Sequence, residues 1–227
     1  MIDSFHIGAY WKNRKEFLEN IISPALKTLK GLSDLDEQFL TLYELGNSRK
    51  QALENEVSLT SEIIKKLYQE GVKKNDIDQD GYNKIGYNFS VWTGHEDGKS
   101  SKISFRAGSS SERVSNVCLI KLPYEGTAKD RLLQLSKVKE IMKLIIQNWN
   151  PDTMILKSGK LSDALGTVNE VGWVTYTKNL KGRVKLNNKV VHEESFCGGH
   201  LFYLKTENGL AYDYSLIDEL IPITKIV

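Results

Sequence analysis

The segment YNFSVWT, residues 87–93, alternates large apolar side chains with small polar ones. A period of two is typical of a β-strand with one buried face. Residues 102–107 and 114–122 repeat the pattern, and polar turns at residues 96–98 and 108–111 separate the three segments. We therefore predict an antiparallel meander in the middle of the chain, and this meander decides the fold class.

Apolar residues at helical spacing flank the meander on both sides. The strongest pattern covers residues 128–148, and another runs from Phe17 to Leu29, where Pro24 is expected to kink the helix and Gly31 to end it. Shorter helices are predicted at residues 39–43, 58–71, 161–165 and 215–220, and further strands at residues 5–11, 153–157, 173–177 and 200–205.

These helices and strands do not alternate as regular βαβ units, so the predicted class is α+β. We expect a mostly antiparallel sheet packed with several helices. No linker rich in Gly, Ser or Pro divides the chain. A single domain over residues 1–227 is therefore expected.

Two features of the sequence bear on the cellular compartment. No apolar run approaches the ~18 residues of a membrane span, and the first residues, MIDSFHIGAYWKNRK, lack the basic start and apolar block of a secretion signal. Cys118 and Cys197 are too few for a disulfide framework. We expect a cytoplasmic protein without membrane association and with two reduced thiols, and we interpret Cys197 as a small buried side chain.

The net charge of +2 hides a segregation of charge along the sequence. Residues 33–80 carry eleven acidic and six basic side chains, whereas residues 157–189 carry seven basic and two acidic ones. Two solvated faces would explain this pattern. The alternative is that one of these faces meets a partner of opposite charge.

The acidic segment includes DIDQDG, residues 76–81, which matches the first half of a calcium-binding loop. Such a loop needs a bidentate Glu at its twelfth position, which is Tyr87 here, and its ninth position is Lys84. A phenol cannot replace a carboxylate ligand. We interpret the segment as an acidic turn and expect no metal and no cofactor.

A metal-dependent nuclease is an alternative that the sequence leaves open. Asp80, followed by Asp97 and Lys99, matches a pattern in which two carboxylates hold Mg²⁺ and a lysine stabilises developing charge. However, Asp97 and Lys99 lie in a predicted hairpin tip, where Asp-Gly is ordinary turn chemistry. The four His residues have no zinc-ligand spacing, and no glycine-rich phosphate loop is present.

A nucleic-acid-binding module that uses the basic segment from Lys157 to Lys189 is the second alternative. Aromatic residues interleave with lysine between Trp173 and Lys181, a pattern that can stack single-stranded bases. Burial of Trp173 and Tyr176 in the core explains the same pattern, and we favour that explanation. Since no catalytic pattern is convincing, the simplest interpretation is a protein that works by binding, and we expect no nucleic acid among its partners.

Short blocks keep a fixed order along the chain: IGAYW at 7–11, LGNSR at 45–49, DG at 80–81, VWTG at 91–94, WNPD at 149–152, GWVTY at 172–176 and GHLF at 199–202. Together, these blocks resemble the immunity protein 52 family of bacterial polymorphic toxin systems. The resemblance implies a small cytosolic α+β protein that binds and blocks a toxin encoded beside it. It supplies no catalytic residues. The toxins paired with this family commonly resemble restriction-endonuclease-fold nucleases, often delivered by a type VI secretion system.

A nuclease of the kind that the resemblance implies would present a basic surface to the phosphate backbone. An acidic patch on an inhibitor can occupy such a surface and accelerate association by electrostatic steering. The expected toxin-binding residues, all in the acidic segment, are Asp34, Asp36, Glu37, Asp76, Asp78 and Asp80.

Overall fold

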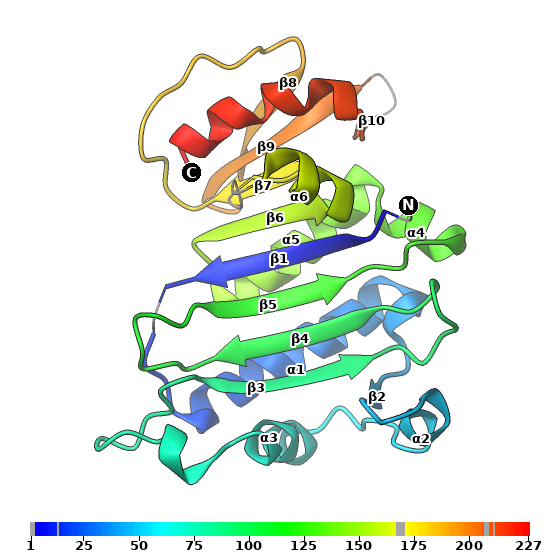
Figure 1. Ribbon diagram of the computed structural model, residues 1–227, viewed down its shortest axis with the longest axis vertical. Coiled ribbons are helices and arrows are strands. Elements are labelled where there is room, and N and C mark those ends of the chain that lie inside the picture. Colours follow the sequence, from blue (N-terminus) through cyan, green and yellow to red (C-terminus); the bar gives the residue numbers. More distant parts are fainter. Residues whose placement is uncertain (1–2, 13, 167–170, 207–208, 211) are drawn as a thin grey trace.

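The structure, a computed structural model, describes residues 3–12, 14–166, 171–206, 209–210 and 212–227. A ten-stranded sheet forms its centre, and all hydrogen-bonded neighbours in it are antiparallel (Figure 1). The strands are β1 (Phe5–Trp11), β2 (Tyr43–Glu44), β3 (Tyr87–Trp92), β4 (Lys102–Ala107), β5 (Asn116–Lys121), β6 (Thr153–Ser158), β7 (Val174–Thr177), β8 (Val191–Phe196), β9 (Gly199–Thr206) and β10 (Gly209–Leu210). Across the sheet they lie in the order β10-β9-β7-β6-β1-β5-β4-β3-β2, and β8 also pairs with β9.

The meander predicted between residues 87 and 122 is confirmed. β3, β4 and β5 are successive neighbours, and their register places Phe89 opposite Phe105 and Phe105 opposite Cys118. All three side chains are buried on the face that alternation assigns to the core. The α+β class is confirmed as well, because this antiparallel sheet packs with several helices.

The opening strand β1 lies in the middle of the sheet, between β5 and β6. Ile7 and Ala9 point into the core and are fully buried. On the other face, the Tyr10 ring folds back over Gly8, where an added Cβ would lie 2.5 Å from the Tyr10 hydroxyl. The N-terminal strand therefore joins the two halves of the sheet.

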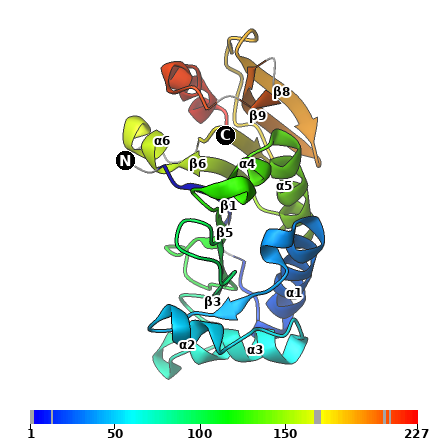
Figure 2. The same ribbon diagram turned by 90° about the vertical axis from the view of Figure 1, so that its right-hand side faces the viewer.

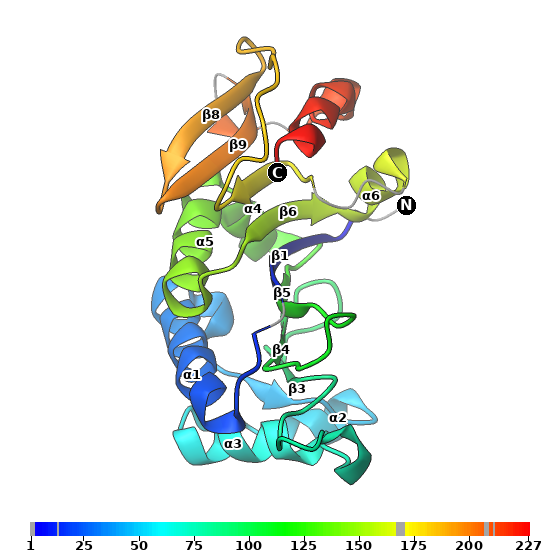
Figure 3. The ribbon, with the colours of Figure 1, turned by 90° about the vertical axis from the view of Figure 1, so that its left-hand side faces the viewer.

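Helices cover one face of the sheet: α1 and α5 lie side by side behind it, and α3 closes the end beside β3 (Figures 2 and 3). Trp149 of α5 stacks with Phe105 at 5.6 Å between ring centroids, and Tyr68 of α3 meets Phe89 edge-on at 4.5 Å. The helices are α1 (Leu18–Leu35), α2 (Arg49–Leu53), α3 (Ser61–Glu70), α4 (Gly126–Leu132), α5 (Leu135–Trp149) and α6 (Gly159–Leu165), with 3₁₀ helices η1 (Glu37–Phe39), η2 (Lys74–Asp76), η3 (Tyr214–Glu219) and η4 (Ile221–Lys225).

The opposite face of the sheet is covered unevenly. α6, η3 and η4 lie over the end formed by β6, β7 and β9, whereas no helix of the described chain lies over β1, β3, β4 and β5 (Figures 2 and 3). Ile155 and Thr175, on the covered part, are buried, but Val117 and Leu119, on the uncovered part, are only half-buried. We call the outward-facing side chains of β1, β3, β4 and β5 the open face.

The long helix predicted over residues 128–148 is wrong, because the segment forms two helices. α4 ends at Leu132 and α5 begins at Leu135. Leu132 and Leu133, at the end of α4, are both buried. At the break, the Tyr212 hydroxyl donates a hydrogen bond of 2.8 Å to the Leu133 carbonyl.

The predicted end of the first helix is also wrong. α1 contains Pro24 and continues through Gly31 to Leu35. Gly31 lies where α1 meets α5, and an added Cβ there would be 2.4 Å from Leu144 Cδ1. The glycine is therefore present for close packing between helices.

Other short segments differ from the prediction. Residues 39–43 form the end of η1 and the start of β2, and the C-terminal helix is a 3₁₀ helix. Three strands and one helix have too few apolar residues to be predicted from periodicity: β2, β8, β10 and α2.

Candidate functional site

The six acidic residues expected to bind a partner lie at the two ends of α1. One group is at its C-terminal end, and the other is a turn beside its N-terminal end, where Phe17 stacks on Tyr82 at 4.3 Å. A helix of 18 residues is about 27 Å long, so the carboxylates do not form one continuous patch. The C-terminal group is Asp34, Asp36 and Glu37, and the N-terminal group is Asp76, Asp78 and Asp80.

In the N-terminal group, Asp78 organises the turn. Its carboxylate accepts hydrogen bonds from the backbone N–H groups of Asp80 and Tyr82, at 3.0 and 2.9 Å, and from the Ser110 hydroxyl at 2.7 Å. The Ser110 hydrogen bond and the backbone donors lower the pKa of Asp78, although desolvation opposes them. Gly81, with a φ of +87°, completes the turn, so the spacing that resembles a calcium loop serves backbone geometry here.

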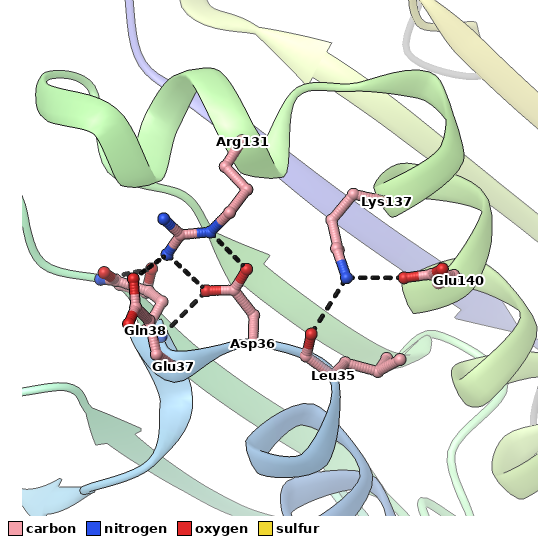
Figure 4. A network of polar contacts seen from close by, with 8 residues as sticks. Leu35, Asp36, Glu37, Gln38, Arg131, Lys137 and Glu140 are labelled. Atoms are coloured by element: carbon pink, nitrogen blue, oxygen red, sulfur yellow. Dashed lines mark hydrogen bonds and ion pairs between the residues drawn. The ribbon is translucent and has the colours of Figure 1, made fainter.

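In the C-terminal group, Asp36 is held by an arginine of α4 (Figure 4). Arg131 Nε donates to Asp36 Oδ2 at 2.7 Å, and Arg131 Nη2 donates to Oδ1 at 2.8 Å. Oδ1 also accepts the Gln38 backbone N–H at 2.9 Å. Burial raises the pKa of Asp36, but the hydrogen bonds from Arg131 and Gln38 outweigh burial and hold the pKa below its ordinary value. Asp36 therefore joins the end of α1 to α4.

Gln38 ties the same segment to the tip of the meander. Its buried side-chain amide donates to the Lys99 carbonyl at 2.8 Å and lies 3.2 and 3.3 Å from the hydroxyls of Thr93 and Ser101. These partners are 55 to 63 positions away in the sequence, so sequence patterns missed Gln38. As a result, the acidic end of α1 and the β3–β4 loop lie together.

A depression of about 380 Å³ opens beside this network. Glu37 lies on its rim with a side chain that is 73% exposed, although it pairs with Arg131 Nη2 at 3.0 Å. Leu40, also on the rim, is 64% exposed. An exposed carboxylate beside an exposed leucine is a combination that suits contact with another protein.

The exposure of the six carboxylates decides which of them can reach a partner. Asp36 is buried, and Asp76 and Asp78 are half-buried. The Asp76 carboxylate also accepts the Lys73 backbone N–H at 3.2 Å, which caps η2. The exposed members of the set are Asp34, Glu37 and Asp80.

The structure does not assemble the nuclease arrangement of Asp80, Asp97 and Lys99. Asp80 precedes β3 and Asp97 follows it, so a six-residue strand, about 20 Å long, separates their segments. Lys99 Nζ pairs with Glu96 Oε2 at 3.0 Å in the exposed β3–β4 loop. Within the described residues, no group of three His, Cys, Asp or Glu side chains could hold a metal ion.

The aromatic residues of the basic segment belong to the core, as we predicted. Trp173 and Tyr176 are 0% and 1% exposed, and the rings of Tyr212 and Tyr214 meet Trp173 edge-on at 5.7 and 5.0 Å. Neither Trp173 nor Tyr176 can stack with a base. The exposed cations of the segment lie mainly in the β7–β8 loop and are Lys160, Lys181, Arg183, Lys185 and Lys189.

The interpretation of Cys197 as a buried side chain is wrong. Cys197 is exposed and forms the two-residue β8–β9 turn with Gly198. Both residues have positive φ, 48° and 80°, as a type I′ hairpin turn requires. Cys118 is buried in the core as a free thiol, and burial raises its pKa.

Among the described helices, none has both the length and the apolar character needed to cross a bilayer.

A solved structure has a similar fold. The structure is similar to that of the Pseudomonas aeruginosa T6SS protein PA0821, with a TM-score of 0.52 and 10% sequence identity over 98% of this chain and 70% of that chain. At this identity the likeness shows the fold alone. No curated protein sequence matches significantly.

The model of the immunity protein 52 family matches residues 3–208. The match covers most of the chain, so the protein belongs to this family. The resemblance inferred from the short sequence blocks is thereby confirmed.

Proposed function

We propose that this protein binds a cognate toxin in the cytoplasm and neutralises it without catalysing a reaction. Membership of the immunity protein 52 family is the observation that carries the proposal. The separation of Asp80 from Asp97 and Lys99 by the length of β3 also supports binding over metal-dependent cleavage.

The proposed toxin is a nuclease with a restriction-endonuclease fold, delivered by a type VI secretion system or another polymorphic toxin system. A T6SS protein of similar fold supports this delivery route. A nuclease needs a basic surface for the phosphate backbone. Exposed carboxylates at the end of α1, Asp34 and Glu37, would steer such a surface towards the inhibitor.

The test is expression of the toxin encoded by the adjacent gene, with and without this protein. We expect the toxin alone to stop growth and degrade DNA, and co-expression of this protein to restore growth. Toxicity that is unchanged by this protein would overturn the proposal. Toxicity without DNA degradation would show that the toxin is not a DNA-cleaving nuclease, while the proposal that this protein neutralises it would stand.

A control assay separates the proposal from the nuclease alternative. Purified protein incubated with Mg²⁺ and plasmid should leave the plasmid intact. Cleavage by the wild-type protein that is lost in an Asp80→Asn/Asp97→Asn variant would reverse the assignment.

A further inference from the structure

The open face of the sheet combines positive charge with apolar surface. Lys102, Arg106 and Lys121 lie on it, and among the described outward-facing residues of β1, β3, β4 and β5 none is acidic. Val117 and Leu119 form its half-buried aliphatic centre. In Figure 1 this face points towards the reader, with α1 and α5 behind it.

Two lysines stand directly opposite each other on this face. The register pairs Lys102 of β4 with Lys121 of β5, and Lys121 with His6 of β1. Like charges at directly opposed positions destabilise an antiparallel sheet. Both lysines are exposed, and neither forms an ion pair with any residue in the described part of the chain. A carboxylate placed between the two lysines would offset their repulsion.

Hollows in the open face adjoin the lysine pair. One, of about 210 Å³, lies between Lys102, Lys121 and Trp92, with Leu45 on its rim at 51% exposure. Asp97 also lines it, but its carboxylate accepts the Gly98 backbone N–H at 3.0 Å and forms no ion pair with either lysine. Another, of about 450 Å³, lies over Leu119 and neighbouring side chains. An apolar centre with hollows and a charged margin is the usual anatomy of a protein–protein interface.

The chemistry of the face selects among possible occupants. A second copy docked by two-fold symmetry would bring the cationic faces together, which is unfavourable. A nucleic-acid duplex needs a series of cations along its phosphate backbone, whereas the centre of this face, Val117 and Leu119, is apolar. A single strand would need aromatic rings free for stacking. However, the Trp92 indole N–H donates to the Glu44 carbonyl at 3.2 Å and its ring leans on Tyr43, while Tyr10 is folded over Gly8. A protein surface that presents carboxylates and apolar side chains fits best.

We propose that the open face is the docking surface for the toxin, with a toxin carboxylate seated between Lys102 and Lys121 and toxin apolar side chains packed on Leu119. This inference rests on the proposed function and specifies which surface of the protein contacts the toxin. Lys102 follows the loop that Gln38 holds, so the open face and the Glu37 depression meet at the same end of β3 and β4. One toxin can therefore contact both.

The decisive variant is Lys102→Glu, because it should raise the thermal stability of this protein and weaken its binding to the toxin. In the fold it replaces a like-charged cross-strand pair with a Glu–Lys pair, which should raise Tm by about 1 to 3 °C. In the complex it places a carboxylate against the toxin carboxylate. The double variant Lys102→Glu/Lys121→Glu should raise the Kd for the adjacent-gene toxin about 100-fold or more.

Lys27→Glu is the matched control, since Lys27 is an exposed lysine on α1, on the other side of the sheet. Its Kd should stay within about threefold of wild type. If the wild-type protein binds the toxin and the double variant binds it with the same Kd, the open face is not the docking surface, although the proposed function stands. The same conclusion follows if Lys27→Glu weakens toxin binding as much as the double variant does. A wild-type protein that binds no toxin overturns the proposed function as well. If Lys102→Glu abolishes self-association or DNA binding and leaves toxin binding unchanged, the open face binds a second copy or DNA and not the toxin.

Discussion

Arg131 and Asp36 form a bidentate ion pair although 95 positions separate them in the sequence. The pair is asymmetric, because the Asp36 side chain is 3% exposed and the Arg131 side chain is 33% exposed. Loss of the arginine would leave a carboxylate buried without its cation. Loss of the carboxylate would leave a guanidinium that already reaches water. The two deletions should therefore differ in cost.

We expect Arg131→Met to lower the free energy of unfolding by about 3 kcal/mol, because a buried charge loses its partner. Asp36→Asn should cost less, about 1.5 kcal/mol, since the remaining cation can be solvated. Urea denaturation followed by tryptophan fluorescence measures both values. As a control, Lys137→Met removes a more exposed ion pair with Glu140 and a hydrogen bond to the Leu35 carbonyl, and it should cost less than either, about 1 kcal/mol. Equal costs for the three variants would contradict this asymmetry.

The same ion pair predicts how stability depends on pH. The pKa of Asp36 is lower in the folded protein than its ordinary value of 3.8. Its stabilising contribution is therefore complete above that value and is lost as the pH falls through the folded pKa. The difference in unfolding free energy between wild type and Asp36→Asn should be constant from pH 7 to pH 5 and shrink below about pH 4. A difference that grows towards low pH would show that the sign is wrong.

The strands that could be predicted from the sequence are those in which apolar and polar side chains alternate. β1 and β4 have the predicted bounds because each strand alternates core and outer side chains over its whole length. β8 was missed because VHEESF is polar and is held by pairing with β9 through the Cys197–Gly198 turn. At the break between α4 and α5, the Leu133 carbonyl accepts a hydrogen bond from Tyr212, which lies 79 positions away and so leaves no local signal.

The candidate site was less predictable than the fold, because the charge count ignores what each carboxylate contacts. Asp36 and Asp78 are both occupied by hydrogen bonds within the protein. The Lys102–Lys121 pair was invisible in the sequence, since it exists only in the register between β4 and β5. Register depends on the whole sheet and follows from no single segment.

Gly172 shows why one of the family-like blocks begins with glycine. The backbone N–H of Trp173 donates to the Leu156 carbonyl at 2.7 Å, and a Cβ on Gly172 would lie 2.2 Å from that oxygen. We expect Gly172→Ala to cost about 3 kcal/mol, because the backbone must move to relieve the overlap. Thermal and urea unfolding measure the loss. Gly159→Ala, where the nearest atom would be 3.6 Å away, is the control and should be neutral or slightly stabilising.

The exposed carboxylates at the C-terminal end of α1 should affect the rate at which the toxin associates. The six acidic residues cannot be reversed together, because reversing Asp36 would break the Arg131 pair. Asp34→Lys/Glu37→Lys reverses only exposed carboxylates. If they steer a basic nuclease, this variant should lower the association rate constant about tenfold at low salt and flatten its dependence on ionic strength. Stopped-flow mixing measures both quantities, with Glu62→Lys, an exposed carboxylate of α3 outside the set, as the control. Unchanged kinetics at low salt would remove the acidic end of α1 from toxin recognition and leave the open face as the proposed contact.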